Sequence, residues 1–532
     1  MIRRMNRRAS AYLFLAAIVL AALPACERKS VVEAGLDPLP PAVVLRRGNG
    51  GDPQTLDPAR AEDVQAFTVL LDLYEGLVVA DAIGDIIPGV AESWDVSSDG
   101  LTHTFHLRPG ARWSNGEPVT ANHFLTGFQR TMSPATNSVY AFLLESLLDV
   151  SATDDATLVI ELRSPTPYLL SVLAMPIAFP LWHDGEIDAG QFSEPGKFVG
   201  NGAYLLDEWL PGAHIRLRKN AEFHDSERVA IDFVEYYAVQ DLLSELNMYR
   251  AGQLDITASV PGSHVNILRE SHGGELQIAP SLALYYVAFD LSESPLDNAE
   301  LRQALTMAID REALVTAIGR GEQPAYGLVP DGVTGYQAAR FRWQGLEAEQ
   351  REEQARQFYA RAGYSRAEPL QLILMYDVGD IHEKIALAVS AMWREVLGVN
   401  VELDKREWKY FLETRENRAD WQSMRFAWTG DYNHPSTFTG ILHSASPQNL
   451  SGYASARYDE LLSAAATAID ADAQMRILAQ AERVMLDDNP IVPLYFYVSK
   501  HLVASSVAGF QQNVLDQHPS RFITKTVPLP TN

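Results

Sequence analysis

The chain has 532 residues, of which 47% are hydrophobic and 21% charged, and its formal net charge is −25. This length and composition predict several globular domains with sizeable cores. The acidic charge argues against nucleic-acid binding, because binding phosphates requires clustered lysines and arginines. The same charge argues against tight docking of the protein surface on anionic lipid.

The first 26 residues are typical of an export signal. Four arginines lie in "MIRRMNRR", and the apolar run "YLFLAAIVLAAL" (12–23) is too short to span a bilayer but suits a secretory h-region. "LPAC" then ends in Cys26, the only cysteine, and resembles the lipobox of bacterial lipoproteins. We therefore expect a signal peptide at 1–25, whose removal leaves a charge of −29, and a lipid on Cys26. A plain signal peptide with an incidental cysteine is the alternative, and without a full twin-arginine motif the general export route is favoured.

The expected elements follow a proline-rich tether at 26–41. They are a strand at 42–48, a helix at 64–78, a hairpin-like stretch at 101–119, a strand and a helix at 157–173, and a two-strand stretch at 202–220. Amphipathic helices are expected at 301–318 and 383–399. Strands at 370–377 and 400–408 flank the second helix and predict a β-α-β unit with parallel strands. The fold class is therefore mixed α/β in more than one lobe.

Enzymatic signatures are absent from the sequence. There is no P-loop, no G-x-S-x-G elbow and no second cysteine. "HEKIA" (382–386) has Ala386 where a zinc protease needs its second histidine. "HDGE" (183–186) and "HDSE" (224–227) could hold a metal, but such loop pairs are usually solvated. We expect that the protein is not an enzyme and binds no cofactor and no metal. A hydrolase or a chaperone is the alternative.

Several segments together resemble one family. They are "GGDPQTLDPARAEDVQAFTVLLDLYEGLV" (50–78), "PGVAESWDVSSDGLTHTFHLRPGARWSNGEPVTANHF" (88–124), "NGAYLLDEW" (201–209), "LRQALTMAIDRE" (301–312), "EWKYFLETR" (407–415) and "FAWTGDYNHPSTF" (426–438). In their sequence and in their order over nearly the whole mature chain, these segments resemble those of the oligopeptide-binding proteins. These proteins are the extracytoplasmic receptors of peptide ABC transporters.

The resemblance implies a two-lobed periplasmic-binding-protein type II fold with a hinge and an additional domain. The implied domains are lobe I (42–75, 186–284 and 499–532), the extra domain (76–185) and the second lobe (285–498). The chain would cross between the lobes near 281–290 and 495–503, where paired strands would form the hinge.

The resemblance also implies a peptide site. Asp431 would hold the peptide's α-ammonium, and the strand edge carrying Ala427 and Thr429 would pair with the peptide backbone. Without the resemblance, Asp431 could instead be an acid that caps the Asn-His-Pro turn. The remaining implied site residues are Arg425 and Arg415 for the ligand carboxylate, His382 for longer peptides, Glu62 as a pocket acid, and Trp408 and Tyr140 as pocket aromatics.

Some of these assignments keep alternatives. Arg415 could be a surface arginine at a helix end, and Trp408 and Tyr140 could pack in the core. Arg320 is a candidate replacement for a family lysine near the terminus of long peptides.

The sequence thus predicts a monomeric receptor that captures short peptides between two closing lobes. It would deliver them to permease subunits with their ATPases and would be anchored through Cys26 in the periplasm, or at the cell surface in an organism with a single membrane. A murein-peptide receptor of the same family is the alternative.

Overall fold

The computed structural model describes residues 42–183, 189–417 and 421–526, and the expected signal peptide, lipid attachment site and tether lie outside them. These residues form a mixed α/β structure with three main sheets. Within the described ranges, none of the helices combines the length and the apolar character that crossing a bilayer requires.

The first sheet has the order β1-β10-β9-β8. Its strands are β1 (Val44–Gly48), β8 (Tyr204–Leu210), β9 (His214–Lys219) and β10 (Phe233–Tyr237). The helices α1 (Val64–Leu73), α4 (Leu242–Arg250) and α5 (Val265–Ser271) belong to the same part of the chain. β8 and β9 pair antiparallel around the Pro-Gly turn, which confirms the two-strand prediction at 202–220.

The second sheet has the order β4-β5-β7-β6 and is antiparallel throughout. Its strands are β4 (Ala91–Val96), β5 (Thr102–Leu107), β6 (Leu147–Asp154) and β7 (Thr157–Leu162), accompanied by α2 (Ala121–Met132), α3 (Leu169–Leu173) and the small β2 (Val78–Ala80) and β3 (Ile86–Pro88) pair. The hairpin predicted at 101–119 is wrong. β5 pairs with β4 and β7 instead, and only an isolated bridge between Arg112 and Pro118 encloses the Asn-Gly turn.

The third sheet has the order β12-β16-β11-β15-β13-β14. Its strands are β11 (Leu276–Phe289), β12 (Gln323–Pro324), β13 (Gln371–Asp377), β14 (Asn400–Arg406), β15 (Ser423–Thr429) and β16 (Ile491–Leu502), with β17 (Val507–Ala508) and β18 (Thr524–Lys525) forming a separate pair. The helices are α6 (Ala299–Met307), α7 (Arg311–Ile318), α8 (Ala348–Arg361), α9 (Asp380–Leu397), α10 (Trp408–Asn417), α11 (Ser436–Thr439), α12 (Ala456–Ala466) and α13 (Ala471–Asp488). β13 and β14 pair parallel on either side of α9, as the β-α-β prediction requires.

The single helix predicted at 301–318 is in fact two helices, α6 and α7. Asp310 separates them, because its backbone is extended and its Oδ1 accepts the N–H of Ala313 as the N-cap of α7. An aspartate prefers this capping position over a helix interior. The apolar periodicity continues across the break, which is why the sequence alone suggested one helix.

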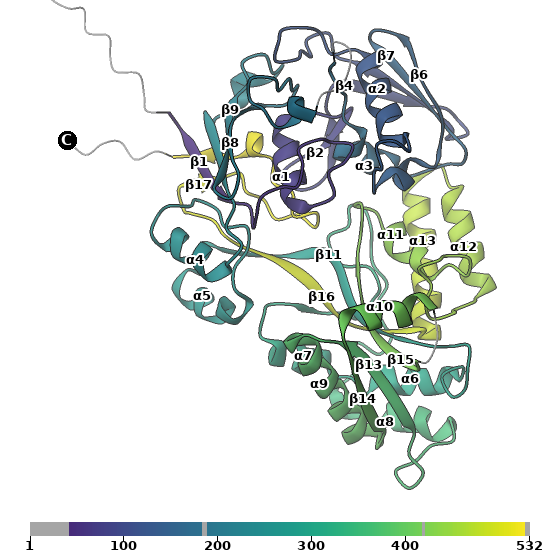
Figure 1. Ribbon diagram of the computed structural model, residues 1–532. Helices are drawn as coiled ribbons and strands as arrows, with labels where there is room; N and C mark the ends of the chain where they lie inside the picture. The colour runs from purple at the N-terminus through teal and green to yellow at the C-terminus, as the bar shows by residue number, and fades with distance from the viewer. Residues whose placement is uncertain (1–41, 184–188, 418–420, 527–532) are drawn as a thin grey trace, which may run out of the picture. The chain divides into compact units, whose positions relative to one another are not determined.

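Two long strands, β11 and β16, run antiparallel beside each other through the third sheet (Figure 1). Their register shifts between Pro280 and Leu284. The isolated bridges Arg47–Ile256 and Ile256–Val503 then connect the end of β16 to the first sheet. Both predicted crossing segments thus lie in one paired ribbon that connects two sheets.

The buried apolar side chains form two large cores and one small one. One core belongs to the third sheet and its helices. The second includes residues of both the first and second sheets, among them Leu45, Phe105 and Tyr204. The small third core packs α4 and α5 against Leu502. The predicted boundaries between lobe I and the extra domain stay a prediction, because these two parts share one core.

Candidate functional site

β15 has one edge without a strand partner over most of its length. It pairs with β11 from Ser423 to Thr429, but with β13 only at Ser423 and Met424. From Arg425 onward no other described strand covers the second edge. An unpaired strand edge presents backbone N–H and C=O groups that an extended ligand can bind.

The same strand segregates its side chains by face. Met424 and Phe426 are buried in the core, whereas Ala427 and Thr429 are exposed. Because alternate residues of a strand share a face, Arg425, Ala427 and Thr429 form one row. Asp431 lies two residues beyond this row. The sequence-predicted strand residues therefore share one face, which presents only small side chains between Arg425 and Asp431.

The carboxylate of Asp431 is half-buried and has no hydrogen-bond or ion-pair partner among the described residues. Its backbone N–H donates to Thr437 Oγ1 over 3.1 Å, but its carboxylate caps no turn. Burial raises the pKa of Asp431 above its ordinary value, because no cation compensates the lost hydration. Among the described residues, no cation lies close enough to Asp431 to offset the burial of its carboxylate.

Three of the predicted residues come together from distant parts of the sequence. Burial raises the pKa of Tyr140, and the negative charges of Asp431 and Glu62 raise it further. Tyr140 also contacts Phe67, with ring centroids 5.7 Å apart, and packs against the second core. Tyr140 is thus both a packing residue and a neighbour of the two acids, while Glu62 itself is exposed.

Arg425 is bound by an internal carboxylate that the sequence reasoning did not identify. Asp377, the last residue of β13, accepts a hydrogen bond from Arg425 Nε through Oδ1, and the same oxygen forms an ion pair with Arg425 Nη2. The Arg425 side chain is only 12% exposed, and the guanidinium lies over the rings of Trp408 and Phe411 at 5.9 and 5.3 Å. This ion pair occupies the point where β15 and β13 diverge, so the predicted carboxylate-binding cation is already neutralised.

His382 belongs to the same group of side chains. Its Nε2 lies 3.9 Å from Asp377 Oδ2, and its Nδ1 lies 3.1 Å from the hydroxyl of Tyr285. Burial lowers the pKa of His382, as does the charge of Arg425, while Asp377 opposes both effects. The charge of Arg320 also lowers the pKa of His382, so Arg320 lies close enough to this group to act on its charges.

Of the two other predicted residues, Trp408 lies at the border of this group, whereas Arg415 is a neighbour of Tyr286. Trp408 is 50% exposed and stacks on Phe411 at 5.9 Å, so it is not a core residue. Arg415, near the end of α10, is half-buried, and its guanidinium has no ion-pair partner among the described residues. Its charge lowers the pKa of Tyr286, which burial otherwise raises.

Of the two sequence candidates for a metal, one is engaged in ion pairs and the other lies largely outside the described residues. His224 of "HDSE" is 2.8 Å from Glu75 Oε2, and Arg521 binds the other oxygen of Glu75 at 2.6 Å. His224 is therefore engaged in a buried ion-pair network. "HDGE" falls largely on residues 184–188, which lie outside the described residues.

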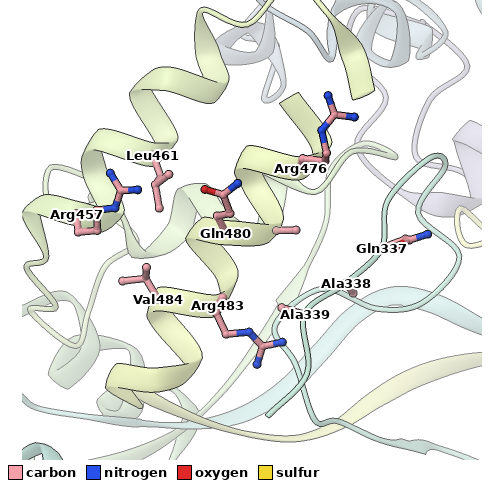
Figure 2. A pocket seen from close by; sticks show the side chains of 10 residues that line it. Gln337, Ala338, Ala339, Arg457, Leu461, Arg476, Gln480, Arg483 and Val484 are labelled. Carbon is pink, nitrogen blue, oxygen red and sulfur yellow. The ribbon is translucent and has the colours of Figure 1, made fainter. Parts of the chain in front are cut away.

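A separate pocket of about 540 Å³ lies on α12 and α13 (Figure 2). Arg457, Arg476 and Arg483 line it, but each already has a protein partner, namely Glu460, Asp470 and the carbonyl of Arg340. The pocket shares no residue with the row along β15. It is therefore distinct from the candidate ligand site.

Comparison with known proteins assigns the family. Residues 85–449 match the bacterial extracellular solute-binding proteins, family 5. The probable deoxycholate-binding periplasmic protein YgiS of Escherichia coli K12 is 35% identical over 491 residues, covering 89% of this chain and 91% of YgiS. The periplasmic oligopeptide-binding protein OppA of the same strain is 34% identical over 486 residues, covering 88% and 89%.

A solved structure extends the similarity to the fold. The periplasmic murein tripeptide-binding protein MppA, in its unliganded open form, aligns with a TM-score of 0.86 at 32% identity and covers 91% of this chain and 98% of MppA. The chain belongs to family 5 of the bacterial extracellular solute-binding proteins, and the predicted two-lobed α/β fold and family resemblance are confirmed.

Proposed function

We propose that this protein is the substrate-binding component of a peptide ABC transporter and that it holds short peptides along β15. The unpartnered carboxylate of Asp431 carries this proposal, together with the family membership and the peptide-binding relatives. A half-buried carboxylate gains most from a cation that arrives with the ligand, and the α-ammonium of a peptide is such a cation. The expected location is the periplasm, because YgiS and OppA are periplasmic proteins.

The row along β15 sets the scale of the ligand. Four residue steps separate Arg425 from Thr429, and at about 3.3 Å per step they span about 13 Å. An extended peptide of roughly three to five residues fits between Asp431 at one end and Arg425 with His382 at the other. Ala427 and Thr429, exposed and small, leave room for ligand side chains of different kinds.

The carboxylate end of the ligand competes with Asp377. Since Arg425 is already paired, a ligand carboxylate gains little net charge attraction there unless Asp377 releases the guanidinium. Arg320, whose charge acts on His382, is a cation that can contribute without breaking this pair, and Arg415 stays the second expected cation. We therefore propose that affinity depends more on the ligand's ammonium than on its carboxylate.

Because the chain is similar to a probable deoxycholate-binding protein, bile salts are a second class of ligand to consider. A bile salt carries a carboxylate and no ammonium. It offers nothing to Asp431 and would bring a second negative charge toward Glu62 and Asp431. The charge distribution therefore favours a peptide over a bile salt.

Membrane attachment through Cys26 remains part of the proposal and depends on the sequence of the export signal alone. The cognate permease subunits, the ATPases and a monomeric state are expected from the transporter context.

Calorimetric titration of the purified protein with a tripeptide, a murein tripeptide and deoxycholate tests the function. We expect the tripeptide to bind with at least a tenfold advantage over deoxycholate. Binding of deoxycholate alone would contradict the peptide proposal, and a preference for the murein peptide would narrow it. Mass spectrometry of ligands that co-purify with the protein identifies the natural ligand independently.

A further inference from the structure

Two histidines and an aspartate converge at the end of β16, far from the ligand site in sequence. The atoms His501 Nε2, Asp516 Oδ1 and His518 Nε2 all lie within 4.8 Å of one another. Asp516 Oδ1 is 2.8 Å from His501 Nε2 and 3.2 Å from His518 Nε2. Both histidines are buried, being 7% and 9% exposed, while the Asp516 side chain is 36% exposed and faces solvent in part.

A hydrogen bond behind His501 orients its imidazole toward Asp516. His501 Nδ1 lies 2.8 Å from the carbonyl oxygen of Thr257, so Nδ1 must carry a proton. In the neutral ring, Nε2 then has a lone pair directed at Asp516 Oδ1. Two acceptors at 2.8 Å require a cation between them, which is either a second proton on His501 or a metal ion.

The loop that carries Asp516 and His518 is held in place by the protein's own contacts. Asn513 closes this loop on itself, since its Nδ2 donates to the carbonyl of Gln517 and its Oδ1 accepts the Gln517 N–H. The Leu282 N–H of β11 donates to the carbonyl of Val514 over 3.1 Å. Phe510 stacks on the His518 ring at 3.8 Å. The ligands therefore do not have to be ordered by the ion.

We propose that His501, Asp516 and His518 form a binding site for a divalent zinc ion. Tetrahedral zinc with bonds of about 2.0–2.1 Å places its ligands about 3.3 Å apart, close to the 2.8 and 3.2 Å separations in the cluster. Imidazole and carboxylate are ligands that zinc accepts, and three protein ligands leave the fourth position for water. The carbonyl of Thr257 supplies the outer hydrogen bond that zinc-bound histidines usually make.

The charges around the cluster have both signs. Arg47 is the nearby cation, and its Nη1 donates to the backbone carbonyl of His518 and to Ser520 Oγ. The acids are Asp72, which binds the Ser520 N–H, and Glu245, a buried carboxylate whose Oε2 has no hydrogen-bond partner. A divalent ion bound by Asp516 would thus lie near one guanidinium, that of Arg47, and one further carboxylate, that of Glu245, whose charges both act on His501.

The position of the site gives it a mechanical consequence. His501 lies on β16 beside the first half of β11, on the first-sheet side of the register shift. Asp516 and His518 lie on the loop attached to Leu282, inside that shift. Zinc would fasten the C-terminal segment to the ribbon that connects two sheets, and would therefore raise thermal stability independently of peptide binding.

The test uses the purified, chelator-treated protein and zinc chloride titrated by calorimetry, with cobalt absorption as a second readout. We expect one ion per chain, tetrahedral cobalt bands and a rise in Tm with zinc. H518Q and D516N should each weaken zinc binding at least tenfold. The matched control is H106Q, because His106 and Asp95 form an exposed His–Asp pair with a similar 2.8 Å contact.

The outcomes separate the explanations. If H518Q and D516N lose zinc binding while H106Q retains it, the proposed site is supported. No stoichiometric binding, or equal binding by all variants, overturns it. A Tm that responds to pH but not to zinc also overturns it, because the cluster is then a protonated ion pair. Circular dichroism identifies a variant that fails to fold, in which case the other variant decides.

Discussion

Replacing Asp377 with asparagine changes the charge next to Arg425 while conserving the size of the side chain. In the wild-type protein Asp377 neutralises a guanidinium that is 12% exposed and lies over aromatic rings. Removing one member of a buried ion pair typically costs about 3–5 kcal/mol of stability. We expect the loss of stability in D377N to lie at or below the low end of that range, because the asparagine carbonyl can still accept one hydrogen bond from Arg425.

The effect on binding should have the opposite sign. A hydrogen bond to a charged partner contributes about 1.5–3 kcal/mol, which corresponds to roughly 10- to 150-fold in affinity. In D377N the ligand carboxylate can satisfy Arg425, so peptides with a free C-terminus should gain on this scale over the same peptides with a C-terminal amide. In the wild-type protein the acid and the amide should differ by less than about fivefold, or about 1 kcal/mol.

The assay is calorimetry with tri-, tetra- and pentapeptides in acid and amide forms, combined with thermal unfolding of both proteins. The lower Tm of D377N should be restored by acid peptides more than by amides. If the wild-type protein already prefers the acid by more than tenfold, and D377N does not increase this preference, Asp377 does not screen the ligand end.

Further predictions concern the same site, the core and the anchor. Affinity for peptides with a free amino group should fall on acidification at a pH above the ordinary aspartate range near 3.9, because burial raises the pKa of Asp431 and protonation removes the partner of the ammonium; titrations at several pH values with an N-acetylated control test this. His382→Ala and Arg425→Ala should lower affinity at different peptide lengths, and an identical loss at every length would contradict separate roles. Arg311→Ala should cost more than about 4 kcal/mol in denaturant unfolding, because four backbone carbonyls lose their buried donor. Cys26→Ser should move the protein from the membrane fraction to the soluble fraction or stall its processing, and unchanged fractionation would exclude the lipid.

The sequence predicts those parts of the fold that local patterns encode. The β-α-β unit follows from alternating strand and helix periods, whereas the ribbon of β11 and β16 was expected from the family resemblance. The break at Asp310 is a local signal too, but it was hidden by apolar residues that continue at helical spacing. The supposed hairpin after residue 101 failed because turn residues do not determine which distant strand pairs with β5.

The residues of the candidate site also differ in whether the sequence could indicate them. Asp431 and the strand before it could be proposed because the family resemblance covers the short stretch that contains both. The partner of Arg425 could not, because Asp377 is 48 residues away in sequence and contacts it only where two strands diverge. The cluster of His501 with Asp516 was equally invisible, since a strand end and a turn in the C-terminal segment have no sequence spacing that marks them as neighbours.

The most direct measurement of the central claim is a double-mutant cycle between Asp431 and the amino group of the ligand. Wild-type protein and Asp431→Ala are each titrated with a free tripeptide and its N-acetylated form, which gives four dissociation constants. Truncating one member of a buried charge pair typically costs about 2–5 kcal/mol, or roughly thirty- to several-thousand-fold in affinity. We expect each single change to weaken binding on that scale and the combined loss to be far smaller than their sum. The same ratio of free to acetylated affinity in both proteins would show that Asp431 does not hold the ligand's ammonium.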